Sequence, residues 1–204
     1  MCFVNDEELK KAYSKVALDY DCFIIGGSFH DEVEESNVCP IFCPNGKIVV
    51  QRKIFRSKEF GEGIKIRKEE TIKIVNYGQG KFSSLICIDS ESEKIRDVLK
   101  ERLGRCKCPE LIFNPSCTSA ISRANSQLRN LMSLIFASVV FCNDGSFGCS
   151  CVFFPEISLK KQDFKKIQIK KSTTETVYGK IELDISALQS YKRANINCLI
   201  APKE

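Results

Sequence analysis

Apolar positions along the chain follow two spacings, one typical of helices and one typical of strands. Apolar residues three positions apart are clearest at Leu128, Leu131 and Leu134, near the end of a long helical pattern. Helices are predicted at residues 6–19, 91–104 and 119–136. Shorter apolar runs predict strands at residues 22–27, 38–43, 47–53, 72–75, 82–88, 110–114, 138–142, 149–154 and 181–184. Helices that alternate with strands predict an α/β domain built in layers.

Two short segments between these runs have the composition of tight turns. Asn45-Gly46 separates two predicted strands, and this pair favours a hairpin because both residues tolerate positive φ. Gly78-Gln79-Gly80 is a second break in the pattern. Some strands should therefore pair through hairpins, and others through helical crossovers.

Length and composition are those of one globular domain over residues 1–204. Hydrophobic residues make up 43% of the chain and charged residues 28%, which disfavours disorder. No apolar run reaches the roughly 18 residues of a membrane-spanning helix. The first residues lack the basic and apolar regions of a secretory signal. We therefore expect a cytoplasmic protein with no membrane partner.

The twelve cysteines could indicate disulfides, a zinc site or reduced thiols. A disulfide framework is typical of short secreted domains, and this chain has neither the length nor the signal of one. The pair Cys39 and Cys43 has the spacing of structural zinc ligands, whereas the other close pairs do not, and His30 is the sole histidine. Reduced and mostly buried thiols are the favoured interpretation, with no metal and no cofactor.

The net charge of +5 is mild, and basic residues gather mainly between residues 160 and 171. A nucleic-acid surface normally combines a stronger positive field with aromatic side chains in a groove. A solvated loop or strand edge explains the basic stretch better. Binding of nucleic acid is therefore not expected.

Residues 83–90 carry the most informative chemistry in the chain. Cys87 lies at the end of an apolar, strand-like run, and Asp89 follows it at the start of a polar segment. A thiol on the turn after a strand is lifted clear of the sheet, a position that suits a nucleophile. The alternative is a buried cysteine that acts as a small hydrophobic residue.

Three motifs, in this order along the chain, resemble the signature of the nitrilase, or carbon–nitrogen hydrolase, superfamily. They are Arg52-Lys53-Ile54, Gly61-Glu62-Gly63 and Ile86-Cys87-Ile88-Asp89. Further stretches that match the family order are residues 23–27, 37–46, 111–116, 139–153 and 179–185. The resemblance spans about residues 7–192 and implies a four-layer α-β-β-α sandwich.

The resemblance implies hydrolysis of a non-peptide C–N bond, in an amide, a nitrile or a carbamoyl amine, through a cysteine thioester. Cys87 would be the nucleophile, and Lys53 would stabilise both the thiolate and the oxyanion. The backbone N–H of Ile88 would be the second oxyanion donor, and Glu62 would position the site or the substrate. Members of the family commonly form homodimers, so a homodimer acting on a small amide or nitrile is expected.

Each of these residues also has a structural interpretation. Lys53 could point to solvent from a strand edge, and Glu62 could be a solvated loop residue. Asp89 could be the N-cap of the following helix, since Asp satisfies free N–H groups in a first turn. Arg129 could be an ordinary surface residue of the long helix.

One part of the family pattern is absent, namely a glutamate in a Pro-Glu pair well before the lysine. The Pro-Glu pair of this chain, Pro155-Glu156, comes far too late, and Glu32, Glu34 and Glu35 occupy a different position from the family glutamate. We therefore expect a domain that lacks the first strand and helix of the family fold. It is then a piece of a longer protein or a shortened form.

Three hypotheses follow for the function. The first is an amidohydrolase whose general-base glutamate is supplied elsewhere. The second is a catalytically degenerate nitrilase-like module for assembly. The third is an accessory domain of a larger protein that acts on nucleic acid.

Overall fold

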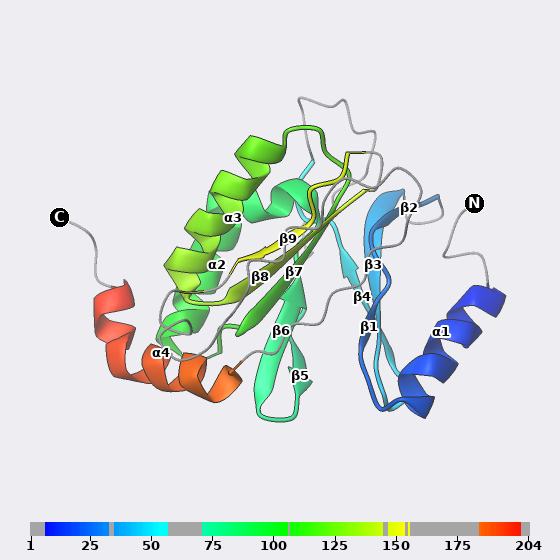
Figure 1. Cartoon of the computed structure of the whole chain (residues 1–204), viewed down its shortest axis with the longest axis horizontal. Coiled ribbons are helices and arrows are strands. Elements are labelled where there is room, and N and C mark those ends of the chain that lie inside the picture. Colours follow the sequence, from blue (N-terminus) through cyan, green and yellow to red (C-terminus); the bar gives the residue numbers. More distant parts are fainter. Residues whose placement is uncertain are drawn as a thin grey trace.

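Two β-sheets lie face to face in the computed structural model, with helices on both outer sides (Figure 1). The structure describes residues 7–32, 35–56, 71–105, 107–144, 147–153, 155 and 184–200. The layers run from α1 (Glu7–Asp19), through the two sheets, to α2 (Glu93–Gly104) and α3 (Ile121–Ile135). The α-β-β-α sandwich that the resemblance implied is confirmed. Within the described part of the chain, no helix is long and apolar enough to cross a membrane.

The first sheet is antiparallel and centres on β3 (Ser36–Phe42). β4 (Ile48–Arg52) pairs with β3 along one side, while β1 (Ile24–Ile25) and β2 (Phe29–Asp31) pair with different parts of β3. The predicted hairpin between β3 and β4 is confirmed. Gly46 has φ +79°, and the Lys47 N–H donates to Asn45 Oδ1 at 3.1 Å.

The second sheet has the order β5-β6-β7-β8-β9. Its strands are β5 (Val75–Tyr77), β6 (Gly80–Ser84), β7 (Leu111–Ser116), β8 (Ser138–Asn143) and β9 (Cys151–Phe153). β6, β7 and β8 are parallel, while β5 and β9 are antiparallel edge strands. Parallel strands need crossovers, which α2 and α3 provide. The carboxyl ends of β6 and β7 therefore meet at one edge of the sheet.

Two apolar cores hold the layers together. The larger core lies between the second sheet and its helices, and Leu99, Ile112 and Leu128 are fully buried there. The smaller core lies between the sheets and centres on Phe82, whose ring packs edge-on against Phe23 and Phe113. These cores fix the strands whose ends carry the site.

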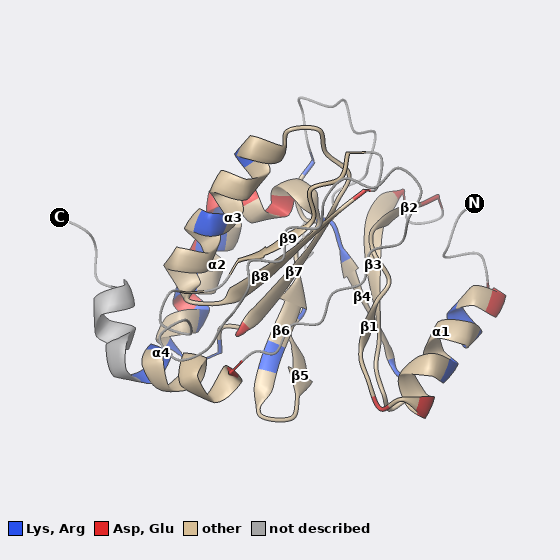
Figure 2. Ribbon diagram, in the orientation of Figure 1, with Lys and Arg blue, Asp and Glu red and all other residues tan. Residues whose placement is uncertain are grey.

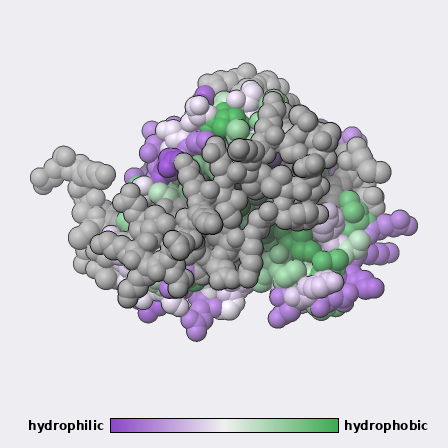
Figure 3. Space-filling model, viewed as in Figure 1, coloured by the Kyte–Doolittle hydropathy of each residue, from purple (hydrophilic) through white to green (hydrophobic). Residues whose placement is uncertain are grey.

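Helix α1 covers the outer face of the first sheet. Its Tyr13 ring stacks on Phe42 with centroids 5.5 Å apart, and Ala17 is buried. At its carboxyl end Val16, Leu18 and Tyr20 are exposed. Hydrophobic atoms gather beside this helix, flanked by hydrophilic ones (Figure 3).

The structure corrects several predicted boundaries. The strand predicted at residues 82–88 ends at Ser84, and Cys87–Glu91 forms a 3-10 turn, η2. Helix α4 (Ile185–Ile200) was not predicted, because Ile185 continues the alternating pattern of Ile181 and Leu183. The strand predicted at residues 181–184 falls mostly outside the described residues. β2 was also missed, since three residues are too few for a pattern.

Candidate active site

Cys87 lies in a sharp turn just after β6. The strand is extended by Leu85, whose N–H donates to the Phe113 carbonyl at 2.8 Å. Cys87 then takes φ +51°, in the left-handed region that side chains other than glycine seldom occupy. This conformation costs about 1–2 kcal/mol in an L-residue. The chain reverses here into η2, and the Cys87 side chain is half-buried.

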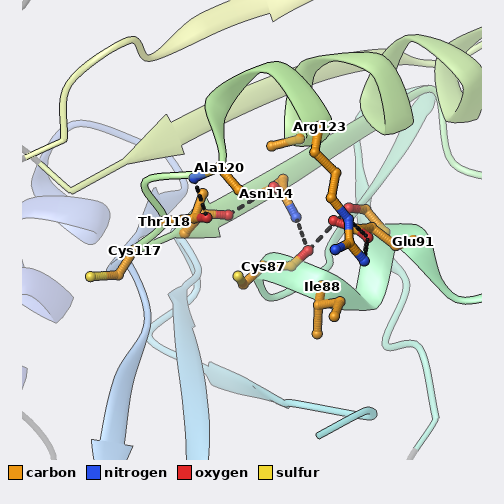
Figure 4. Close-up of a pocket in the computed structure, with 11 residues that line it drawn as sticks. Cys87, Ile88, Glu91, Asn114, Cys117, Thr118, Ala120 and Arg123 are labelled. Atoms are coloured by element: carbon orange, nitrogen blue, oxygen red, sulfur yellow. Dashed lines mark hydrogen bonds and ion pairs between the residues drawn. The ribbon is translucent and has the colours of Figure 1, made fainter. Parts of the chain in front are cut away.

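The turn is held by Asn114, a buried residue of β7. Its Nδ2 donates to the carbonyl of Leu85 at 2.6 Å. It also donates to the carbonyl of Cys87 at 3.0 Å (Figure 4). Ser90 Oγ donates to the same Cys87 carbonyl, and Ser116 Oγ donates to Asn114 Oδ1. Sequence reasoning did not single out Asn114. The only hint in the sequence was that an amide side chain stands within a predicted apolar strand.

Asp89 joins the Cys87 turn to the segment after β4. One carboxylate oxygen accepts the N–H of Phe55 at 2.8 Å, and the other accepts the N–H of Ile86 at 3.2 Å. The N–H of Ile54 lies 3.1 and 3.2 Å from the two oxygens. Asp89 therefore holds the residues that follow Lys53 against the residue that precedes Cys87.

The Asp89 carboxyl is fully buried, and burial raises its pKa to about 7. The N–H groups of Phe55 and Ile54, the charge of Lys53 and the N–H of Ile86 lower the pKa in part. The predicted N-cap role of Asp89 is wrong. Ser92 caps α2 instead, since its Oγ accepts the N–H of Ile95 at 3.5 Å.

Lys53 is buried, with only 1% of its surface exposed, so the interpretation as a solvent-facing strand-edge residue is wrong. Its backbone N–H donates to the Asn37 carbonyl at 2.8 Å, which continues the pairing of β3 and β4. Its ammonium lies near enough to Asp89 for the positive charge to lower the pKa of that carboxyl. Glu62 lies outside the described residues.

A cavity of about 170 Å³ opens beside Cys87 and Ile88. Its wall is mixed, with Asn114 and Thr118 among the polar lining residues and Ile88 and Ala120 among the apolar ones. Cys117, which follows β7, is a second thiol at this cavity, and burial is the largest cause that raises its pKa. Cys117 lies on one side of Cys87, while Glu91 and Arg123 lie on the other (Figure 4). The cavity can hold a small ligand against the thiol.

Glu91 and Arg123 form an ion pair across the cavity wall. Nε and Nη2 of Arg123 both lie 2.9 Å from Glu91 Oε2, and the Arg123 side chain is about half exposed. The pair joins η2 to the first turn of α3. Solvent screening limits the strength of such a pair.

We expect a double-mutant cycle of Glu91→Gln and Arg123→Gln to give a coupling energy below about 1 kcal/mol. The free energy of unfolding, measured by urea titration, provides the test. A coupling well above this value would show that the pair is more shielded from solvent than its exposure indicates.

Two other residues from the sequence also have clear positions. Arg129 is an exposed surface residue of α3, as expected, and its guanidinium lies 4.8 Å from the centroid of the Phe153 ring. Cys39 is buried, and Ser84 Oγ donates to its sulfur at 3.4 Å, which links the two sheets. The cysteines that the structure describes are free thiols.

Comparison with known proteins gives matches among solved structures. No family model and no curated protein sequence matches the chain. Nit3 of Saccharomyces cerevisiae, a member of branch 10 of the nitrilase superfamily, superposes with a TM-score of 0.66 at 20% identity, over 91% of this chain and 68% of Nit3. The chain has the nitrilase-superfamily fold.

Amidases of Nesterenkonia sp. AN1 share this nitrilase fold. One mutant, which shows Michael addition of acrylamide at its active-site cysteine, has a TM-score of 0.58 at 16% identity. It is matched over 73% of this chain and 61% of its own length. The NitN amidase has a TM-score of 0.63 at 14% identity, over 94% of this chain and 74% of NitN. The chain thus spans about three-fifths of the first of these amidases.

Proposed function

We propose that the chain is the cysteine-bearing part of a carbon–nitrogen hydrolase that acts on small amides. The observation that carries the proposal is the Asp89 carboxylate, which binds backbone on both sides of the site. It ties the segment that directly follows the buried Lys53 to the left-handed Cys87 turn, and that turn lines the cavity. Strained backbone of this kind is concentrated at functional sites.

In the first step the Cys87 thiolate attacks the amide carbon, and the C–S bond forms as the C=O electron pair moves to oxygen. Lys53 and the N–H of Ile88 stabilise that oxyanion. A carboxylate base takes the thiol proton and gives it to the nitrogen. The C–N bond breaks, ammonia leaves and a thioester remains. The base is proposed as a chemical class, and no residue of this chain is assigned to it.

In the second step water attacks the thioester carbon. The same carboxylate takes a proton from the water, the C–S bond breaks and the thiolate is regenerated with a carboxylic acid. A cysteine suits this chemistry because amides are poor electrophiles, and a covalent intermediate divides the reaction into two easier steps.

Small amides are the first substrates to test. The cavity of about 170 Å³ is small. A mutant of the Nesterenkonia amidase has been crystallised with butyramide, and another shows acrylamide added to its active-site cysteine. Butyramide is therefore the proposed substrate for this chain, and acrylamide a covalent probe.

The test measures ammonia released from butyramide by the full chain, together with the intact mass after exposure to acrylamide. We expect ammonia release and a single adduct, and Cys87→Ala should abolish both. Cys22→Ala is the matched control, since Cys22 is a free thiol outside the cavity.

Slow labelling spread over several cysteines, with no release of ammonia, would overturn the proposal. Fast labelling of Cys87 without ammonia would overturn hydrolysis by this chain alone. That second result would favour a degenerate nitrilase-like module that keeps an activated thiol.

A further inference from the structure

A second cavity lies at the opposite end of the sheet from Cys87. Its volume is about 300 Å³, and it opens where α4 passes the beginnings of β6 and β7. Lys81 of β6, Glu110 just before β7, and Lys192 and Arg193 of α4 line it. Lysine and arginine segments of β6 and α4 lie at the same end of the molecule as the acidic start of β7 (Figure 2).

Lys192 is the central cation of this cavity and is buried, with 7% of its surface exposed. Its Nζ donates to the Pro109 carbonyl at 2.8 Å. An ammonium has three N–H donors. The other two have no protein acceptor among the residues that the structure describes. A buried charge with open donors is costly unless a partner satisfies it.

The cavity also holds more positive than negative charge. Among the lining residues that the structure describes, three carry basic side chains and one, Glu110, carries a carboxylate, and Glu110 is 4% exposed. Glu110 Oε2 already accepts the backbone N–H of Lys81 at 2.7 Å. Burial and the charge of Lys81 both lower the pKa of Lys192, while Glu110 raises it. The described lining residues therefore carry a net positive charge.

We propose that this cavity binds a small oxyanion, a phosphate group, through Lys192, Lys81 and Arg193. The oxygens of a phosphate accept the open N–H donors of Lys192 and offset the excess positive charge. Arg193 is exposed at the rim and can form a bidentate pair with two of the oxygens. The site is separate from Cys87 and does not depend on the proposed hydrolysis.

The phosphate can come from the free ion or from a phosphate ester. Isothermal titration calorimetry on the full chain at low ionic strength, with inorganic phosphate, glycerol 3-phosphate and glycerol, distinguishes the two. We expect both phosphates to bind and glycerol to give no heat. Tighter binding of glycerol 3-phosphate would identify an ester as the ligand, whereas equal binding would identify the ion.

Lys192→Met and Arg193→Gln should each weaken phosphate binding about tenfold, as the loss of a charge-assisted hydrogen bond implies. Arg193→Gln keeps the test valid if Lys192→Met fails to fold, because Arg193 is exposed. Lys100→Gln is the control, since Lys100 lies on α2 outside the cavity and should leave binding within about twofold.

No binding of either phosphate up to about 10 mM would overturn the proposal, since that limit excludes more than about 3 kcal/mol of affinity. The proposal would also be overturned if phosphate bound the native chain, Arg193→Gln and Lys192→Met with equal affinity. Potassium chloride at matched ionic strength separates specific binding from charge screening.

Discussion

Lys53→Met is expected to slow the reaction of Cys87 with acrylamide about tenfold at neutral pH and to lower amide turnover by about 10²–10³. A free thiol is mostly protonated at neutral pH, and a nearby cation favours the reactive thiolate. Lys53 is suited to this role because its ammonium is buried, where charge interactions are weakly screened. Methionine has a similar volume and removes the charge together with the N–H donors of the ammonium.

The measurement is the rate of adduct formation by intact mass across a range of pH, with ammonia release from butyramide beside it. Lys47→Met is the matched control, because Lys47 is exposed in the β3–β4 turn and should leave both rates unchanged. Circular dichroism checks that the Lys53 variant is folded. If that variant is labelled as fast as the native chain, an interaction between Lys53 and Cys87 is contradicted.

Asp89→Asn is expected to lower the free energy of unfolding by about 2–4 kcal/mol at about pH 5. A protonated carboxyl keeps acceptor lone pairs on both oxygens, whereas Asn offers an NH₂ donor in place of one oxygen. That donor would face the N–H of Ile86 or those of Ile54 and Phe55. One or two buried N–H groups would lose their acceptor.

The difference in the free energy of unfolding between the native chain and Asp89→Asn should decrease as the pH rises. Burial raises the Asp89 pKa to about 7, above the 3.8 of a solvent-exposed aspartate, so the folded state binds the proton more tightly. Its contribution to stability is full below about pH 4 and is lost as the pH rises towards 7, at no more than about 1.4 kcal/mol per unit. Urea unfolding at about pH 5 and about pH 8 measures this change.

Asp97→Asn is the control, because Asp97 is exposed on α2 and paired weakly with Lys100. It should change the free energy of unfolding by less than about 0.5 kcal/mol. A difference for Asp89→Asn that widens with pH would mean that the carboxylate is held in its charged form.

The parts of the fold that depend on local pattern could be predicted from the sequence. The Asn45-Gly46 hairpin and the periodic apolar face of α3 need only neighbouring residues, and both are present. The motif resemblance predicted the layered sandwich. It also singled out Lys53 and Cys87, whose segments the structure brings together through Asp89.

The contacts that position these residues could not be predicted, because they join segments far apart in the chain. Asp89 was interpreted as a helix cap from its neighbours, whereas its partners Ile54 and Phe55 lie more than 30 positions away. Asn114 looks like an ordinary strand residue until β7 lies beside the Cys87 turn. The cation cluster at Lys192 needs α4, which has no clear pattern of its own.

Under the proposed function, the left-handed backbone of Cys87 implies a trade-off between folding and reactivity. A glycine at this position would form the turn without steric cost, so selection for folding alone would favour glycine. If the thiol is the proposed nucleophile, it occupies this position at a local cost in stability of about 1–2 kcal/mol relative to glycine. A related protein that no longer needs the thiol could become more stable by replacing this cysteine with glycine. Glycine at this turn would therefore indicate that the function of the thiol had been lost.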